Sequence, residues 1–147
     1  MAETKQPIDS PTPWVADHIK EYVASDGKQG HIWRGAPTLL LTTTGRKSGE
    51  QRRTALIYGQ DGDRYVVVAS KGGAPHNPLW YLNLRDHPAA QIQVNAEVID
   101  VRARVTAGDE RTRLWQEMAK IWPDYNNYQT RTRREIPVVV LEPSKRG

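Results

Sequence analysis

The stretch Asp61-Gly-Asp-Arg-Tyr-Val-Val-Val-Ala-Ser-Lys-Gly-Gly-Ala74 carries the clearest structural signal in this sequence. Its first three residues, 61–63, have the composition of a tight hairpin turn. The run rich in β-branched residues that follows, 64–70, predicts a strand. That strand ends in a hydroxyl, a cation and two glycines, and a loop rich in glycine and proline continues to Pro78. The stretch therefore predicts a turn, a strand and a glycine loop in succession.

Other segments on both sides of this stretch also have the apolar, β-branched composition of strands. They are residues 39–44, 53–58, 90–95, 98–106 and 137–141. Because 39–44, 53–58 and 64–70 follow one another closely, they predict an antiparallel meander. A turn near Ala96 joins the next two strands.

Helical signals lie between these strands. Apolar residues recur at helical spacing after Pro13, which predicts a helix over 14–25 that ends before Gly27. Two more helices are predicted over 78–86 and 109–121, and Thr106 with Asp109 resembles a capping box at the start of the second. The order is helix, three strands, helix, two strands, helix, strand. It indicates an α+β fold, a mostly antiparallel barrel with packed helices, because strands and helices do not alternate as in a Rossmann fold.

Length and composition limit the other possibilities. The 147 residues suffice for one hydrophobic core. We expect a flexible N-terminal arm over residues 1–13, which contain three prolines, and a single domain over 14–147. The lack of cysteine excludes disulfides and thiolate sites, and the scattered histidines predict no metal site. The N-terminus has no apolar core and no apolar run is long enough to span a membrane, so a cytoplasmic protein is expected.

Positive charge is concentrated in one turn. The chain has a formal net charge of +4, and Thr44-Gly-Arg-Lys-Ser-Gly-Glu-Gln-Arg52 joins two predicted strands. Arg46, Lys47 and Arg52 supply cationic donors and Ser48 supplies a hydroxyl, a composition that suits a phosphate or a carboxylate-rich ligand. The alternative is a solvated basic hairpin. Arg131, Arg133 and Arg134 form a second basic cluster.

Two further motifs suit a flat, anionic ligand. The glycine loop after Ser70 precedes a predicted helix N-terminus, an arrangement that forms anion-binding nests; the alternative is a simple strand-to-helix connection. In Trp122-Pro-Asp-Tyr125-Asn-Asn-Tyr128, three aromatic side chains gather on a predicted loop. They either wall a pocket or pack beneath the loop.

Together these motifs resemble the deazaflavin-dependent nitroreductases of actinobacteria, a family of the split β-barrel flavin-binding superfamily. The resemblance covers residues 43–143 and rests on four blocks in matching order. They are Gly45-Arg-Lys-Ser-Gly49, the stretch 61–74, Asn77-Pro-Leu-Trp-Tyr-Leu-Asn-Leu84 and Ile136-Pro-Val-Val-Val-Leu-Glu-Pro143. It implies a split β-barrel that binds F420, a deazaflavin with a phosphate and an oligoglutamate tail.

The resemblance also implies roles for individual residues. The positions that would hold the phosphate and tail are Arg46, Lys47, Ser48 and Arg52. The positions that would line the deazaflavin are Ser70, Lys71, Gly72 and Gly73, with Trp80 on the helix behind them. Arg53 and Thr54 would lie near the same groove. The catalytic candidates are Ser70, Tyr125 and Tyr128.

The implied reaction is hydride transfer from C5 of the reduced deazaflavin to a small-molecule acceptor. Acceptors in the family include quinones, nitroaromatics and unsaturated lactones. Ile57 stands where the nitroimidazole-reducing members carry tyrosine, and Trp122 replaces another aromatic residue, so the acceptor pocket is expected to differ. In the family, the N-terminal helix covers the active site or makes a peripheral membrane contact, here through Trp14, Ile19 and Tyr22; the alternative is that this helix packs onto the barrel.

Three other functions remain as alternatives. One is an FMN-binding split-barrel oxidoreductase. The basic turn and the Ser-Lys-Gly-Gly motif favour F420 over FMN as the cofactor. Another is a basic nucleic-acid-binding module, but no helix-turn-helix, RNP or zinc-finger signal is present, so no nucleic acid partner is expected. The third is a carrier that binds F420 without turnover.

Overall fold

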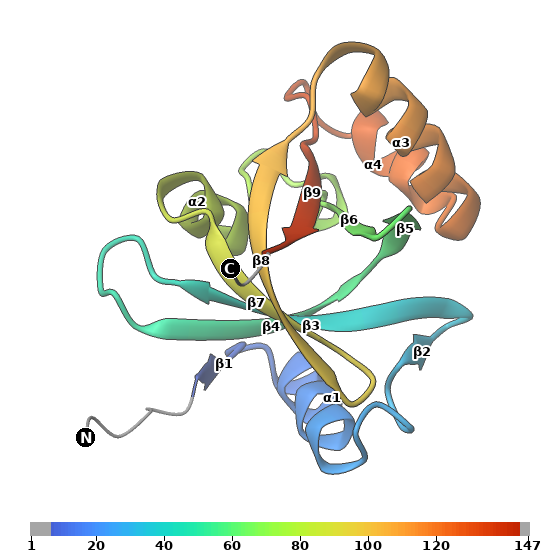
Figure 1. Ribbon diagram of the computed structural model, residues 1–147. Helices are drawn as coiled ribbons and strands as arrows, with labels where there is room; N and C mark the ends of the chain where they lie inside the picture. Colours follow the sequence, from blue (N-terminus) through green and yellow to red (C-terminus); the bar gives the residue numbers. More distant parts are fainter. Residues whose placement is uncertain (1–6, 145–147) are drawn as a thin grey trace.

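A computed structural model describes residues 7–144, and these residues form an α+β fold (Figure 1). The strands are β1 (Ile8–Asp9), β2 (Ile32–Trp33), β3 (Ala36–Thr44), β4 (Gln51–Ile57), β5 (Gly59–Asp61), β6 (Arg64–Val68), β7 (Ala89–Val94), β8 (Glu97–Val105) and β9 (Val138–Pro143). The helices are α1 (Pro13–Ala24), α2 (Leu79–Asp86), α3 (Gly108–Ile121) and α4 (Asp124–Thr130), and a 3-10 turn covers Lys71–Gly73. The predicted fold class is confirmed.

The strands form one sheet that curls into a split barrel. Their order is β1-β4-β3-β7-β8-β9-β6-β5, with β2 paired to β3 off this path. Every ladder is antiparallel except β1 with β4. Within residues 7–144 no ladder joins β4 to β6, although the two strands approach one another. The barrel is therefore open between β4 and β6.

The predicted three-strand antiparallel meander is wrong in its third strand, because β6 does not pair with β4. β3 pairs with β4 as expected, with Leu40 opposite Ala55. β6 instead pairs with β5 and with β9, which lies about seventy residues further along the chain, and Val67 stands opposite Val139. The valine run of β6 fits this central position, because both of its faces are buried.

Alternation along β6 sends side chains into two cores. Tyr65 and Val67 point into the barrel interior, where they join Leu39 and Leu41 of β3. The next residue along, Val66, belongs to a second core with Val68, between the sheet and helices α3 and α4. A strand that is buried on both faces has a nearly continuous run of apolar residues. This is why the segment gives the clearest strand signal in the sequence.

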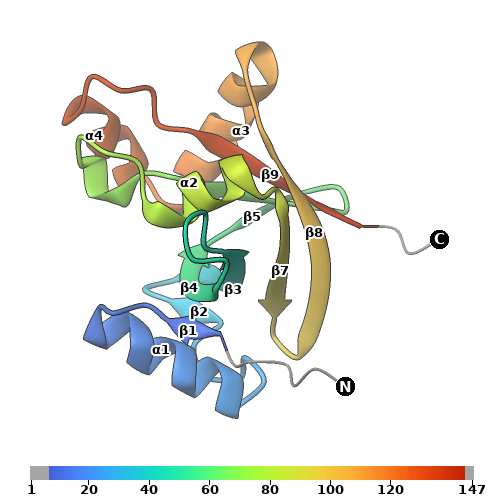
Figure 2. The ribbon, with the colours of Figure 1, turned by 90° about the vertical axis from the view of Figure 1, so that its left-hand side faces the viewer.

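Helix α1 covers the opposite side of the sheet from α2, α3 and α4 (Figure 2). Ile19 and Tyr22 are fully buried against Leu40. The Tyr22 hydroxyl donates to the Thr38 carbonyl at 3.0 Å and accepts a hydrogen bond from the Asn95 N–H at 2.8 Å. Ile19 and Tyr22 therefore pack onto the barrel, as the alternative for this helix predicted. Neither side chain is available to a lipid surface.

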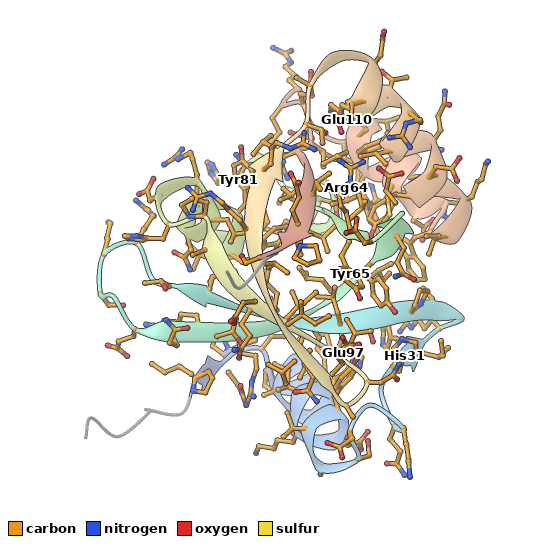
Figure 3. The ribbon with its side chains drawn as sticks, viewed as in Figure 1. His31, Arg64, Tyr65, Tyr81, Glu97 and Glu110 are labelled. Atoms are coloured by element: carbon orange, nitrogen blue, oxygen red, sulfur yellow. The ribbon has the colours of Figure 1, made fainter. Side chains whose placement is uncertain are left out.

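Charged pairs hold α3 against the barrel (Figure 3). Arg64 of β6 lies 3.6 Å from Glu110 of α3, and Arg113 contacts Asp61 at 3.0 Å. The hydrogen bond from Arg113 is the main cause of the lowered pKa of Asp61. Figure 3 shows Arg64 and Glu110 together near α3. This network is separate from the cleft described below.

Three local expectations differ from the structure. Thr106 forms no capping box, because its hydroxyl donates to the Val138 carbonyl at 2.9 Å and Ala107 occupies the N-cap. The predicted aromatic loop is largely helix α4. Of the predicted arm, residues 1–6 lie outside the described residues, whereas Ile8 and Asp9 pair with β4.

No helix in the described range is both long and apolar enough to cross a membrane.

Candidate functional site

A cleft lies where the barrel is split. Its volume is about 470 Å³, within the range of small-molecule pockets. One wall comes from residues 54–57 of β4, and the facing wall comes from Val68 of β6 and the loop that follows it. The start of α1, β2, the start of α2 and helix α4 complete the lining. The missing β4–β6 ladder therefore creates the space for a ligand.

The loop after β6 is a tight turn with an unusual backbone. Lys71, Gly72 and Gly73 have φ values of 45°, 64° and 84°. The turn closes with the N–H of Gly73 donating to the Ser70 carbonyl at 2.9 Å. Ser70, Lys71 and Gly72 line the cleft, whereas Gly73 is buried behind it against α4. In the described part of the chain the Ser70 hydroxyl has no hydrogen-bond partner, so it is available to a ligand.

Aromatic side chains from the end of α3 and from α4 form a wall of the cleft beside this loop. Trp122, Tyr125 and Tyr128 all line the cleft, and the rings of Tyr125 and Tyr128 meet edge to face with centroids 6.1 Å apart. The Tyr128 hydroxyl accepts a hydrogen bond from the Trp122 indole at 3.3 Å. Only 5% of the surface of Tyr125 is exposed, yet its hydroxyl has no hydrogen-bond partner among residues 7–144. It is a second free donor in the cleft.

Three tryptophans from distant segments pack together in the lining of the cleft. Trp33 of β2 stacks on Trp14 of α1 with ring centroids 5.7 Å apart, and it contacts Trp122 at 5.4 Å. All three line the cleft, and Trp14 is the most exposed of them, at 58%. The N-terminus of α1 is thereby joined to the aromatic wall.

Burial raises the pKa of Tyr125 well above its usual value of 10.0, and the neighbouring Tyr128 contributes a smaller effect in the same direction. The phenol therefore stays protonated in the folded protein. Below pH 10 the phenol is protonated in both the folded and the unfolded chain, and its contribution to stability is complete. Above that pH, Tyr125 ionises in the unfolded chain but not in the folded chain, so stability is lost as the pH rises.

This shift predicts alkaline destabilisation that depends on Tyr125. Between about pH 10 and pH 12, the free energy of unfolding of the wild type should fall by up to about 1.4 kcal/mol per pH unit because of Tyr125. The Tyr125→Phe variant should not show this part of the fall. Melting temperatures of both proteins, measured by calorimetry from neutral to alkaline pH, test this. Parallel curves for wild type and Tyr125→Phe would contradict the assignment.

The basic turn carries cations without partners. The side chains of Arg46, Lys47 and Arg52 make no ion pair or hydrogen bond within residues 7–144, and Lys47 and Arg52 are exposed. Arg53, by contrast, is paired with Asp9 at 2.7 Å. The Ser48 hydroxyl accepts a hydrogen bond from the Glu50 N–H at 3.1 Å, so it is already used within the turn.

Asn83 of α2 holds this turn in place, a role that the sequence did not reveal. It is buried, its side-chain oxygen accepts a hydrogen bond from the Arg46 N–H at 3.1 Å, and its amide nitrogen donates to the Thr43 hydroxyl at 3.1 Å. Its place in the block 77–84 was the only signal. The turn does not line the 470 Å³ cleft, but Arg52 shares a face of β4 with Thr54, which does.

The structure divides the predicted site residues into two groups, apart from Gly73, which is buried behind the cleft and does not line it as predicted. Those gathered in the cleft are Ser70, Lys71, Gly72, Trp80, Tyr125 and Tyr128. Those on the adjoining basic turn are Arg46, Lys47, Ser48 and Arg52. A pocket with a glycine loop and aromatic walls suits a flat ring system, and free cations beside it suit an anionic tail. At Gly72 a Cβ would meet nothing within 4 Å, so this backbone is open to close approach by a ligand. The residues present fit a deazaflavin with a polyanionic tail.

Comparison with known proteins gives a consistent result. The model of the F420H2-dependent quinone reductase family matches residues 14–143. An F420H2-dependent quinone reductase of Mycobacterium tuberculosis is 46% identical over 128 residues, which are 84% of this chain and 86% of that protein.

Two solved structures are also similar. An F420-H2 dependent reductase superposes with a TM-score of 0.68 and 40% identity, over 76% of this chain and 98% of that one. A structure described as a domain-swapped dimer has a TM-score of 0.71 and 38% identity, over 90% of this chain and 100% of that one.

Proposed function

This chain belongs to the F420H2-dependent quinone reductase family, and we propose that it reduces a quinone held in the cleft between β4 and β6. It is an oxidoreductase, and its cofactor is F420. The observation that carries the proposed acceptor site is the pairing of two free hydroxyls, on Ser70 and Tyr125, with aromatic walls in one cleft. Such a site can sandwich a flat ring and donate hydrogen bonds to its carbonyl oxygens.

The positions of the residues support the proposed cofactor-binding roles. When bound, F420 in its reduced form supplies a hydride from C5 and, overall, a proton, which convert a quinone to the quinol. Lys71 and Gly72, which line the cleft, would contact the ring. Gly73 supports the loop from behind, and Trp80 would add an aromatic surface to the same cleft. Arg46, Lys47 and Arg52 bind the phosphate and the tail through charge-assisted hydrogen bonds, and Ser48 shapes their turn.

The proposed acceptor-binding roles use the aromatic wall of the cleft and Ser70. Because Tyr125 stays protonated, it serves as a hydrogen-bond donor that orients an acceptor oxygen rather than as an acid. Tyr128 is fixed by the Trp122 indole and closes the wall. Ser70 lies on the cofactor side, where it donates to the acceptor oxygen as charge develops there.

The family name favours a quinone over the other acceptors considered. Ile57 lines the cleft and adds apolar surface, which suits a hydrophobic quinone ring. Nitroaromatics and unsaturated lactones are the alternative acceptors. Exposed apolar residues near the N-terminus, Ile8 and Trp14, offer a peripheral contact with a membrane that holds such a quinone.

The first test of the function is binding and turnover by the intact protein. Titration followed by F420 fluorescence should give saturable binding, with FMN as the control ligand. Oxidation of reduced F420 should then accelerate with menadione, and to a smaller extent with a nitroaromatic or a lactone. Tight F420 binding without turnover of any acceptor would instead identify a carrier.

The hydroxyl assignments predict a separation of turnover from cofactor binding. Ser70→Ala and Tyr125→Phe should each lower kcat with menadione about tenfold, because each removes one hydrogen bond to the developing charge, while F420 affinity is retained. Tyr81→Phe is the matched control, since Tyr81 packs against the barrel core and does not line the cleft. An unchanged kcat in both cleft variants would remove these residues from the catalytic step.

A further inference from the structure

We propose that Arg134 is the positioning residue of the cofactor loop, and that its guanidinium orients the peptide groups of Ser70 and Lys71 toward the deazaflavin. The inference rests on the proposed placement of the cofactor ring against this loop. Arg134 belongs to the second basic cluster of the sequence, and it does not line the cleft. It acts through the loop rather than on the ligand.

The guanidinium of Arg134 binds one segment through several acceptors. It donates to the carbonyl oxygens of Ser70 at 2.8 Å, Ala74 at 2.9 Å and Ala69 at 3.2 Å. It also donates to the side-chain oxygen of Asn77 at 2.8 Å. No carboxylate of residues 7–144 forms a salt bridge with it. The positive charge is therefore directed entirely at backbone and amide oxygens.

These contacts determine where the loop's N–H groups point. In a trans peptide the N–H lies opposite the preceding carbonyl, and no cis peptide is present in the described chain. Because the carbonyls of Ala69 and Ser70 point to Arg134, the N–H groups of Ser70 and Lys71 point away from it. Ser70 and Lys71 line the cleft, so these N–H groups are placed to donate to an electronegative edge of a bound ring.

Arg134 is itself held by the helix of the aromatic wall. Gln129 of α4 donates from its amide to the Arg134 carbonyl at 2.8 Å and accepts from the Ile136 N–H at 3.0 Å. The exposed neighbour Arg133 makes no such side-chain contact within residues 7–144. Through Gln129 and Arg134, the helix that carries Tyr125 and the loop that carries Ser70 are fixed relative to one another.

Only an arginine meets this set of acceptors. Its planar fork carries five donors, whereas a lysine ammonium is a point charge with three donors on a flexible stem. Burial lowers the pKa of Arg134, yet an arginine remains charged at neutral pH. Arg134→Lys should therefore keep the charge and lose the geometry.

The test is F420 binding by Arg134 variants, followed by cofactor fluorescence and independent of turnover. Arg134→Ala and Arg134→Lys should each weaken binding about tenfold, as expected when the charged hydrogen bonds that set a binding geometry are lost. Arg133→Ala, which removes the same charge from the adjacent position, should bind as the wild type does. If Arg134→Ala does not fold, Arg134→Lys decides the question by the same titration.

Chemical rescue separates positioning from a general loss of structure. Guanidinium chloride at sub-denaturing concentration should restore F420 affinity to Arg134→Ala, whereas urea or sodium chloride at the same concentration should not. Wild-type affinity in both Arg134 variants, or equal effects of guanidinium and urea, would overturn the proposal. Failure of the wild type to bind F420 would instead refute the proposed function, so the two failures are distinguishable.

Discussion

Gly73→Ala should lower the free energy of unfolding by about 3 kcal/mol and abolish detectable F420 binding, because both its backbone and its packing exclude a side chain. Gly73 has φ of +84°. A Cβ there would lie 2.6 Å from the Tyr128 carbonyl oxygen and 3.1 Å from the Tyr128 Cα. These are backbone atoms of α4, which cannot rotate away as a flexible side chain would.

The adjacent glycine provides a matched control. Gly72 has φ of +64°, but a Cβ there would meet nothing within 4 Å. Gly72→Ala should therefore cost about 1 kcal/mol, the strain of a left-handed backbone alone. Denaturant unfolding of both variants and the wild type measures the difference. Equal stabilities for the two variants would show that α4 does not press on the loop.

The double substitution Lys47→Ala/Arg52→Ala should weaken F420 binding about 30-fold at low ionic strength, if each exposed cation contributes about 1 kcal/mol to an anionic tail. Both side chains are exposed and lack partners in the described structure, so their loss leaves no buried charge and should leave stability nearly unchanged. The difference from wild type should shrink as salt is added, because exposed charges are screened.

Fluorescence titration at several salt concentrations measures this effect. The control is Lys20→Ala/Lys28→Ala, which removes the same charge from exposed positions at and beyond α1. If the control weakens binding as much as Lys47→Ala/Arg52→Ala does, the effect comes from net charge and not from the basic turn. Equal affinity of the turn variant and the wild type would remove the turn from the tail site.

Local sequence signals account for the elements that were predicted correctly. The strand at 64–70 and the helix at 14–25 were predictable because hydrophobic periodicity and flanking turn residues are read within a few positions. The short helix α4 was missed: seven residues rich in asparagine and tyrosine have no strong helical propensity. Its packing against the glycine loop and α3 stabilises it instead.

The candidate site was predictable as a set of motifs but not as an arrangement. The glycine loop, the basic turn and the aromatic residues were identified from composition and resemblance, and their individual roles stay predictions. Sequence distance concealed Arg134, which is separated by about sixty residues from the loop it binds. It also concealed the pairing of Arg53 with Asp9, which distinguishes this arginine from its free neighbours.

The sequence by itself determined the α+β class, most of the strands and helices, and the family with its F420 cofactor, since these depend on local patterns and on motifs in order. Only the tertiary structure decided that β6 pairs with β9 rather than β4, which leaves the cleft open between β4 and β6. Strand pairing depends on which apolar faces can be buried together across the whole chain. Here Val67 is buried in the barrel interior, and Val66 and Val68 are buried against α3 and α4.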